Sequence, residues 1–146
     1  MTYFARCHCG AVALSCDSEP DPVIICHCKL CRRRTGSLFQ VAAWFDLKSV
    51  LITGATEEFT RTNGDAGLPF TFNFCPACGT TMWWLTSNSK GSLSGKIAIA
   101  GGCFEQADTL KPTISIYEKN RESWLSLPEG IEEIEAGLNI ESHAQN

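Results

Sequence analysis

The sequence contains no long hydrophobic run. No stretch of its 146 residues approaches the ~18 apolar residues that a transmembrane helix needs. The opening segment, Met1-Thr2-Tyr3-Phe4-Ala5-Arg6, also lacks the apolar core of a signal peptide. We therefore expect a cytoplasmic protein that does not enter a membrane.

Basic residues are not in excess either. The chain carries 12 Lys and Arg against 16 Asp and Glu, a net charge of −4, which argues against nucleic acid or an anionic membrane as partner. A local exception is the run Arg32-Arg33-Arg34. No linker and no internal repeat divides the chain. We expect one domain over 1–146, with its core at about 3–131 and a frayed polar tail at 141–146.

Sustained helical periodicity is rare, and most apolar runs are short and rich in β-branched or aromatic residues. Turn residues separate most of these runs. The pattern predicts strands at 11–15, 22–26, 38–45, 50–53, 57–62, 71–74, 81–85, 96–100 and 113–117. Short helices are expected at 30–34 and at 131–136. We predict a mainly β fold, a sandwich or folded meander that carries metal sites in its turns.

Cysteine, in contrast, is abundant. Seven of the nine cysteines fall into three clusters: Cys7-His8-Cys9-Gly10, Cys26-His27-Cys28-Lys29-Leu30-Cys31 and Cys75-Pro76-Ala77-Cys78-Gly79. Thiolates this close in sequence can bind one metal ion from a single turn. A disulfide framework is disfavoured, because the count is odd, Cys-x-Cys neighbours pair poorly and no export signal is visible. Zinc held by thiolates in a reducing compartment is the better interpretation.

The number of clustered cysteines suggests two zinc ions per chain. A closed structural zinc takes four protein ligands, and the remaining three match a catalytic zinc with one open position. The zinc knuckle of Cys75 and Cys78 supplies only two ligands. Cys7 and Cys9 could complete that site, or they could pair with two cysteines of the second cluster. Spacing alone leaves both pairings open.

The cysteine order resembles the glutathione-dependent formaldehyde-activating enzyme family, also called the GFA/CENP-V domain. The likeness extends to Arg34-Thr35-Gly36-Ser37, to Gly102-Cys103-Phe104-Glu105 with Lys111-Pro112, and to Tyr117-Glu118-Lys119, Trp124 and Leu127-Pro128-Glu129-Gly130. The resemblance implies an Mss4-like β fold, with Cys7, Cys9, Cys75 and Cys78 on a structural zinc. It also implies a second zinc, with an exchangeable position, on Cys26, Cys28 and Cys31.

The activity implied by the resemblance is that of a carbon–sulfur lyase acting on a thiol–aldehyde adduct. The reference reaction joins formaldehyde to glutathione. A non-catalytic zinc module that binds a partner, and a redox sensor that releases zinc, remain as alternatives. An open coordination position at the second site would favour the enzyme. Exposed strand edges make a homodimer reasonable.

Several further residues have two interpretations. Arg32, Arg33 and Arg34 could bind substrate carboxylates or form a solvated face. Thr35 and Ser37 could donate hydrogen bonds to the substrate or to a sulfur, or they could shape the turn at Gly36.

Other positions are similarly ambiguous. Cys103 could close the second zinc site as its fourth ligand, or it could be a core residue. His27 should point away from a metal that both neighbouring cysteines bind. We expect Trp44, Trp83 and Trp84 to serve in packing more than in ligand binding.

Overall fold

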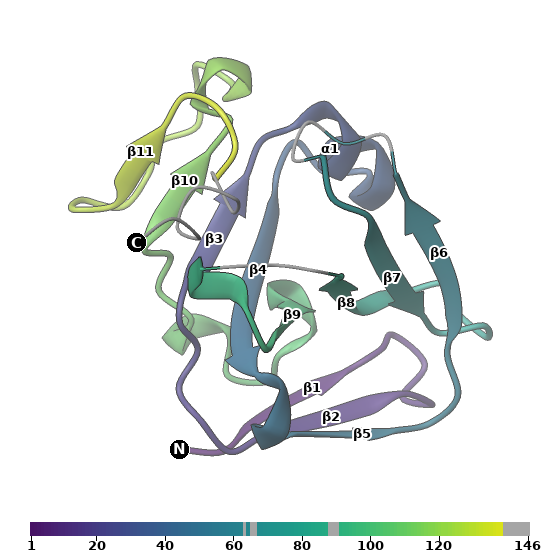
Figure 1. Cartoon of the computed structure of the whole chain (residues 1–146). Coiled ribbons are helices and arrows are strands. Elements are labelled where there is room, and N and C mark those ends of the chain that lie inside the picture. The colour runs from purple at the N-terminus through teal and green to yellow at the C-terminus, as the bar shows by residue number, and fades with distance from the viewer. Residues whose placement is uncertain (63, 65–66, 88–90, 139–146) are drawn as a thin grey trace.

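A computed structural model describes residues 1–62, 64, 67–87 and 91–138 of the chain. Within these ranges the protein is mainly β, with eleven strands in two sheets and one α-helix (Figure 1). No helix in the described ranges is long and apolar enough to cross a membrane.

The larger sheet has eight strands. Their order across the sheet is β11 (Glu132–Ile134), β10 (Ile114–Ile116), β3 (Val23–Cys26), β4 (Gln40–Asp46), β9 (Lys96–Ala100), β8 (Thr81–Thr86), β7 (Phe70–Phe74) and β6 (Glu57–Arg61). β10 pairs in parallel with both β3 and β11, and the other neighbours are antiparallel.

The smaller sheet has three antiparallel strands in the order β1 (Tyr3–Arg6), β2 (Ala13–Cys16) and β5 (Val50–Thr53). The α-helix, α1, spans Lys29–Thr35. Five 3-10 turns complete the described elements: η1 (Leu47–Ser49), η2 (Gly91–Leu93), η3 (Gly101–Cys103), η4 (Ala107–Thr109) and η5 (Glu118–Asn120).

All nine strands predicted from the sequence are present as β2 to β10, with ends shifted by at most two residues. The helix predicted at 30–34 is also confirmed as α1. The helix predicted at 131–136 is wrong, because Glu132–Ile134 forms β11 beside β10. Pairing with a neighbouring strand overrides a weak local helix preference. Strand β1 was not predicted, and the tail at 141–146 lies outside the described residues.

The larger sheet has two apolar faces, because successive side chains of a strand point to opposite sides. On β4, Ala43 and Phe45 belong to one buried cluster, whereas Ala42 and Trp44 belong to another. The same alternation on β9 separates Ile97 and Ile99 from Ala98.

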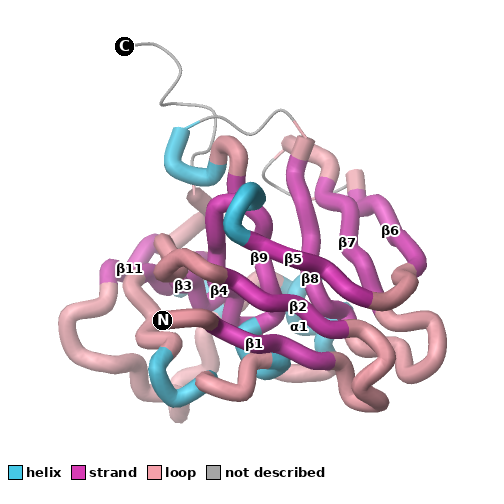
Figure 2. The backbone as a smooth tube through the Cα atoms, turned by 90° about the horizontal axis from the view of Figure 1, so that it is seen from below, coloured by secondary structure: helices cyan, strands magenta, loops and turns pink. Residues whose placement is uncertain are grey.

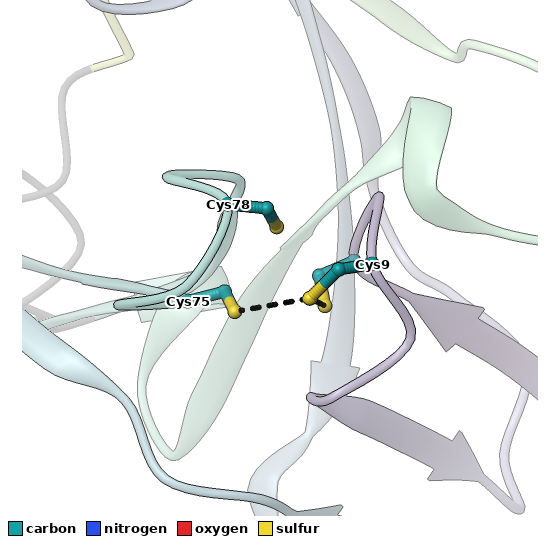
Figure 3. Close-up of side chains that lie close together, drawn as sticks. Cys9, Cys75 and Cys78 are labelled. Atoms are coloured by element: carbon teal, nitrogen blue, oxygen red, sulfur yellow. Dashed lines mark hydrogen bonds between the residues drawn. The ribbon is translucent and has the colours of Figure 1, made fainter.

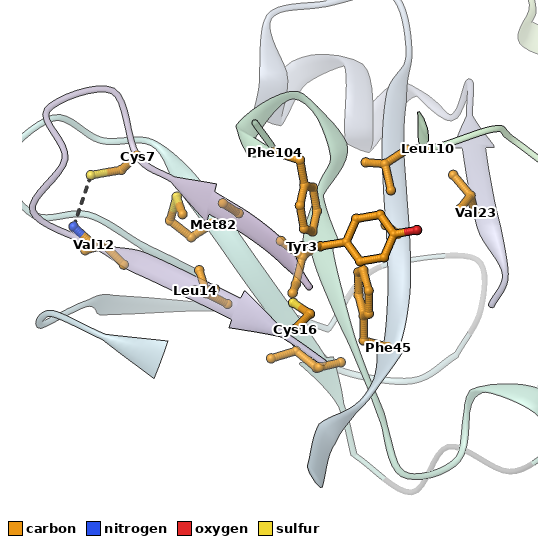
Figure 4. Close-up of a cluster of buried hydrophobic side chains, with 14 of the residues drawn as sticks. Tyr3, Cys7, Val12, Leu14, Cys16, Val23, Phe45, Met82, Phe104 and Leu110 are labelled. Carbon is orange, nitrogen blue, oxygen red and sulfur yellow. Dashed lines mark hydrogen bonds between the residues drawn. The ribbon is translucent and has the colours of Figure 1, made fainter. Parts of the chain in front are cut away.

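The smaller sheet covers the first of these faces. Seen from below, its strands lie across those of the larger sheet (Figure 2). Tyr3 of β1 packs against Phe45 and Phe104, with ring centroids 5.7 and 6.3 Å away (Figure 4). The second face is not covered by this sheet and remains available for a ligand site.

Removing the central ring of this core should destabilise the fold. We expect Phe45→Ala to lower the free energy of unfolding by about 3–5 kcal/mol, since Phe45 is almost fully buried between the sheets. Leu51→Ala, at an exposed position of β5, should change it by less than about 0.5 kcal/mol. Urea unfolding of the metal-loaded protein measures both, and equal losses would contradict this description of the core.

Candidate metal centres and cavity

The first cysteine cluster joins two hairpins from different sheets. Cys7 and Cys9 lie in the loop between β1 and β2, and Cys75 and Cys78 lie in the turn between β7 and β8. Figure 3 shows Cys9 facing Cys75 and Cys78 across the gap between the two turns. Each turn is closed by a backbone hydrogen bond, from the Gly10 N–H to the Cys7 carbonyl in one and from the Gly79 N–H to the Cys75 carbonyl in the other. Both glycines have positive φ, +82° and +75°, which other residues rarely adopt.

The sulfur positions fit a tetrahedral metal site. The Sγ atoms of Cys7 and Cys9 are 3.6 Å apart, and those of Cys9 and Cys75 are 3.7 Å apart. All four sulfurs of the cluster lie within 4.8 Å of one another. Zn–S bonds of about 2.3 Å give tetrahedral edges of about 3.8 Å, whereas a disulfide would need about 2.05 Å. Of the two pairings that spacing left open, the structure therefore has Cys7 and Cys9 with Cys75 and Cys78.

Nearby polar hydrogens stabilise negative charge on these sulfurs. The Val12 N–H donates to the Cys7 sulfur at 3.2 Å, and the Thr80 hydroxyl lies 3.2 Å from the Cys78 sulfur. The Thr80 side-chain hydrogen bond is the main cause that lowers the pKa of Cys78 to about 5.

The second cluster lies where β3 passes into α1. Cys26 is the last residue of β3, Cys28 is the N-cap of α1 and Cys31 lies inside the helix. The Cys28 sulfur accepts a hydrogen bond of 3.3 Å from the Cys31 N–H, so the sulfur itself caps the helix. At the other end Gly36, with φ of +69°, returns its N–H to the Arg32 carbonyl. The local sequence thus fixes the turn that gathers the three sulfurs.

These three sulfurs also lie within 4.8 Å of one another. Hydrogen bonds with Cys26 and Cys31 lower the pKa of Cys28 to about 2, and the contacts of Cys26 with Cys28 and Cys31 raise the pKa of Cys26. No fourth described His, Cys, Asp or Glu joins the group. Three sulfurs with no fourth protein ligand are the donor set of an open zinc site.

A cavity of about 460 Å³ opens beside the second cluster, on the face of the larger sheet that β1, β2 and β5 do not cover. The cysteines Cys26, Cys28 and Cys31 line it. Its apolar wall includes Ile24, Trp44, Phe70, Phe72, Trp84 and Leu93. Strands β3, β4, β8, β7 and β6 each contribute lining residues, so the sheet curves around the cavity.

The charged residues that line the cavity in the described ranges are Lys29, Arg61 and Lys119, with no Asp or Glu among them. In a chain of net charge −4, this gives the cavity a locally positive character. The positive charge also lies where three thiolates would carry negative charge.

The three arginines after Cys31 have different surroundings. Arg32 pairs with Glu122 at 3.0 Å, and Arg33 is exposed. The Arg34 guanidinium lies over Phe72 and Trp84, 4.6 and 4.9 Å from the ring centroids, and donates to Gln40. None of the three is among the described residues that line the cavity beside the cysteines. Their assignment to substrate binding therefore remains a prediction without a contact in this cavity.

Thr35 and Ser37 lie in the turn after α1. The Thr35 hydroxyl donates to the Cys31 carbonyl at 2.8 Å and accepts from the Ser37 N–H at 3.1 Å. Both residues are exposed. These contacts match the turn-shaping interpretation of the two residues.

Cys103 lies at the first cluster rather than at the second. It packs against the core that includes Cys7 and Cys75, and its thiol lies 3.9 Å from the Thr81 carbonyl. Burial is the main cause that raises its pKa to about 11, followed by the charges of Cys7 and Cys78. Cys103 is not among the sulfurs grouped with Cys26, Cys28 and Cys31, so of its two interpretations the structure favours the core residue over the fourth ligand.

His27 points away from the cysteine cluster, as expected from its place between two ligand candidates. It is fully buried, and its Nε2 lies 3.0 Å from the Ser115 hydroxyl. Ser115 donates to Glu118, whose other oxygen accepts from Arg121 at 2.5 Å. Although burial opposes it, the hydrogen bonds from Ser115 and Arg121 lower the pKa of Glu118. This network connects the residue between Cys26 and Cys28 to β10 and η5.

Sequence reasoning missed Arg61, which lies at the end of β6. The strand itself was predicted at 57–62, but no motif marks the arginine. Only the curvature of the sheet brings it to the cavity that also contains Cys28. Trp44 and Trp84 were expected to serve mainly in packing; they are buried and also line the cavity.

Comparison with known proteins identifies the family. The model of the family "glutathione-dependent formaldehyde-activating enzyme" matches residues 2–120. The chain belongs to the GFA family. A search of curated proteins found no match. Among solved structures, a structural-genomics protein from Rhodobacter sphaeroides is similar, with 22% identity and a TM-score of 0.50 over 70% of this chain and 87% of that one. This likeness supports the fold.

The buried network behind the second cluster should contribute to stability. We expect Ser115→Ala to lower the free energy of unfolding by about 1–3 kcal/mol, because His27 and Glu118 would each lose a buried hydrogen-bond partner. Ser94→Ala, at an exposed position, is the matched control and should be nearly neutral. Urea unfolding compares them, and a neutral Ser115→Ala would show that the network contributes no stability.

Proposed function

We propose that this GFA-family protein is a zinc-dependent carbon–sulfur lyase that forms and cleaves adducts of an aldehyde with a thiol such as glutathione. The observation that carries the proposal is the three-cysteine cluster at the wall of a cavity large enough for a small-molecule substrate. The family match supports the connection with glutathione and formaldehyde. The free cysteines support a reducing compartment such as the cytoplasm.

Two zinc ions per chain fit the residues. Cys7, Cys9, Cys75 and Cys78 would hold a closed structural ion, and Cys26, Cys28 and Cys31 would hold an ion with one exchangeable position. A zinc ion bound there would lower the pKa of the substrate thiol and would polarise a carbonyl group.

The reaction balances without a redox partner. In the forward direction the thiol sulfur bonds to the carbonyl carbon, and the thiol proton ends on the former carbonyl oxygen; cleavage reverses both changes. The chain's own residues would position the reacting groups and shield them from water. The Cys31 N–H orients the Cys28 sulfur, the aromatic wall excludes water, and Lys29 and Arg61 offset the charge of three thiolates.

A non-catalytic zinc module or a redox sensor is the alternative. Such a protein would not need a cavity beside an incomplete ligand set. The proposal of an enzyme is supported by the combination of the two features, together with the position of Cys103 away from the second cluster.

Metal content tests the ligand assignment. Protein purified under reducing conditions should contain two zinc ions per chain by elemental mass spectrometry. Cys28→Ser should retain about one, because it removes a ligand of the second site only, and its circular dichroism should match the parent. A parent value near one after zinc supplementation would contradict the two-site assignment.

Turnover tests the reaction itself. Exchange NMR spectroscopy of a glutathione–formaldehyde mixture should show faster adduct formation and cleavage with the parent protein, and only the uncatalysed rate with Cys28→Ser. Cys103→Ala is the matched cysteine control and should retain both zinc and activity, because its thiol lies at the other cluster. A fully active Cys28→Ser variant would contradict the mechanism.

A further inference from the structure

The surroundings of Arg61 are unusual for a charged side chain. Its guanidinium carbon lies 5.1 and 5.3 Å from the ring centroids of Phe70 and Phe72. Its Nε and Nη1 atoms are buried and have no hydrogen-bond partner within the part of the chain that the structure describes. Buried donors without an acceptor are costly, and the cost falls when a ligand supplies one.

The Cys28 sulfur attracts Arg61 electrostatically when it is a thiolate, but the Nε and Nη1 donors of Arg61 still have no acceptor among the described residues. Lys29 and Lys119 have the same sign, and the described lining residues include no carboxylate. Arg34, which lies over the same Phe72 ring, adds a further positive charge nearby. A guanidinium binds a carboxylate through two parallel N–H donors, a geometry that suits an acceptor entering from the cavity.

The rest of the cavity wall is apolar, in contrast to the charged Arg61. Trp44, Phe72, Trp84 and Leu93 are buried apolar residues that line the same cavity. Its volume of about 460 Å³ lies within the ~300–1,000 Å³ typical of sites for small organic ligands. A one-carbon aldehyde alone would leave most of this apolar surface without contacts.

The geometry points to a substrate with an apolar body and an anionic group, in which Arg61 binds the anion and the aromatic wall binds the body. Arg61 is thus the specificity-determining residue of the cavity. The inference rests on the proposed function in placing the reacting sulfur at Cys26, Cys28 and Cys31. It adds that the carbonyl compound or the thiol carries a hydrophobic group much larger than formaldehyde.

Two unreactive probes separate the two parts of this inference. 4-Phenylbutyrate and 4-phenyl-1-butanol share an apolar body and differ in the anionic group. Their binding to the zinc-loaded protein can be followed by tryptophan fluorescence, since Trp44 and Trp84 line the cavity, and quantified by calorimetry. We expect the carboxylate to bind about tenfold more tightly than the alcohol. Acetate, which lacks the body, should bind about a hundredfold more weakly than 4-phenylbutyrate.

The variant Arg61→Gln should reduce the affinity for 4-phenylbutyrate to that for the alcohol, while the affinity for the alcohol is unchanged. Retained alcohol binding shows that the cavity is intact. Arg6→Gln is the matched control, because it removes the same charge from β1 at an exposed position and should change neither affinity.

A carboxylate preference that survives in Arg61→Gln would overturn the assignment, because the anion would then bind the metal or a lysine. If Arg61→Gln does not fold, the probe affinities of the parent protein alone test the inference. Equal affinities for the two phenyl probes, or for acetate and 4-phenylbutyrate, would overturn the inference. These binding tests need no turnover. An inactive protein with the expected preferences would therefore contradict only the proposed reaction.

Discussion

The convergence of four sulfurs from two hairpins is the constraint on which the rest of this structure depends. Cys7 and Cys75 are buried within the same apolar cluster, although they belong to loops of different sheets. Their position holds the smaller sheet against one face of the larger one. A metal ion at these sulfurs would make that connection part of the folding free energy, since ligands gathered from distant segments are held together only in the folded chain. With one face covered in this way, the opposite face is the one that can form a binding site.

The two faces of the larger sheet therefore differ: one forms a closed core and the other lines a cavity. On one side, Phe45, Ile97 and Ile99 form a closed core with Tyr3 and Phe104. On the other side, Trp44 and Trp84 pack in a buried cluster and also line the cavity. Because neighbouring residues of one strand serve both faces, a change in strand register would disturb the core and the site together. The second cysteine cluster lies at the end of β3, so the same sheet that forms the core also positions its three sulfurs.

Two kinds of support act on this second cluster. Its local support comes from the helix cap, in which the Cys28 sulfur accepts the Cys31 N–H. Its distant support comes from the buried His27, Ser115 and Glu118 network, which connects β3 to the later part of the chain. For the three arginines after the cluster, the sequence leaves anion binding and a solvated face both open. In the structure Arg32 is paired with Glu122, and Arg34 lies against aromatic rings. Among the described residues that line the cavity, Arg61 is the cationic side chain with buried donors that lack a partner, and it comes from a strand on the far side of the curved sheet.

The sequence by itself determined the local features of this protein. The spacing of the cysteines predicted three short metal-binding motifs, short β-branched and aromatic runs predicted nine strands, and the turn glycines predicted where the chain reverses. These features depend on residues within a few positions of one another, so local chemistry is enough to identify them. The tertiary structure alone decided which cysteine pairs converge, that Cys103 lies beside the first cluster, that 132–134 is a strand, and that Arg61 reaches the cavity. Each of these depends on contacts between segments far apart in the chain, whose relative positions follow from sheet order and curvature and leave no signal in the local sequence.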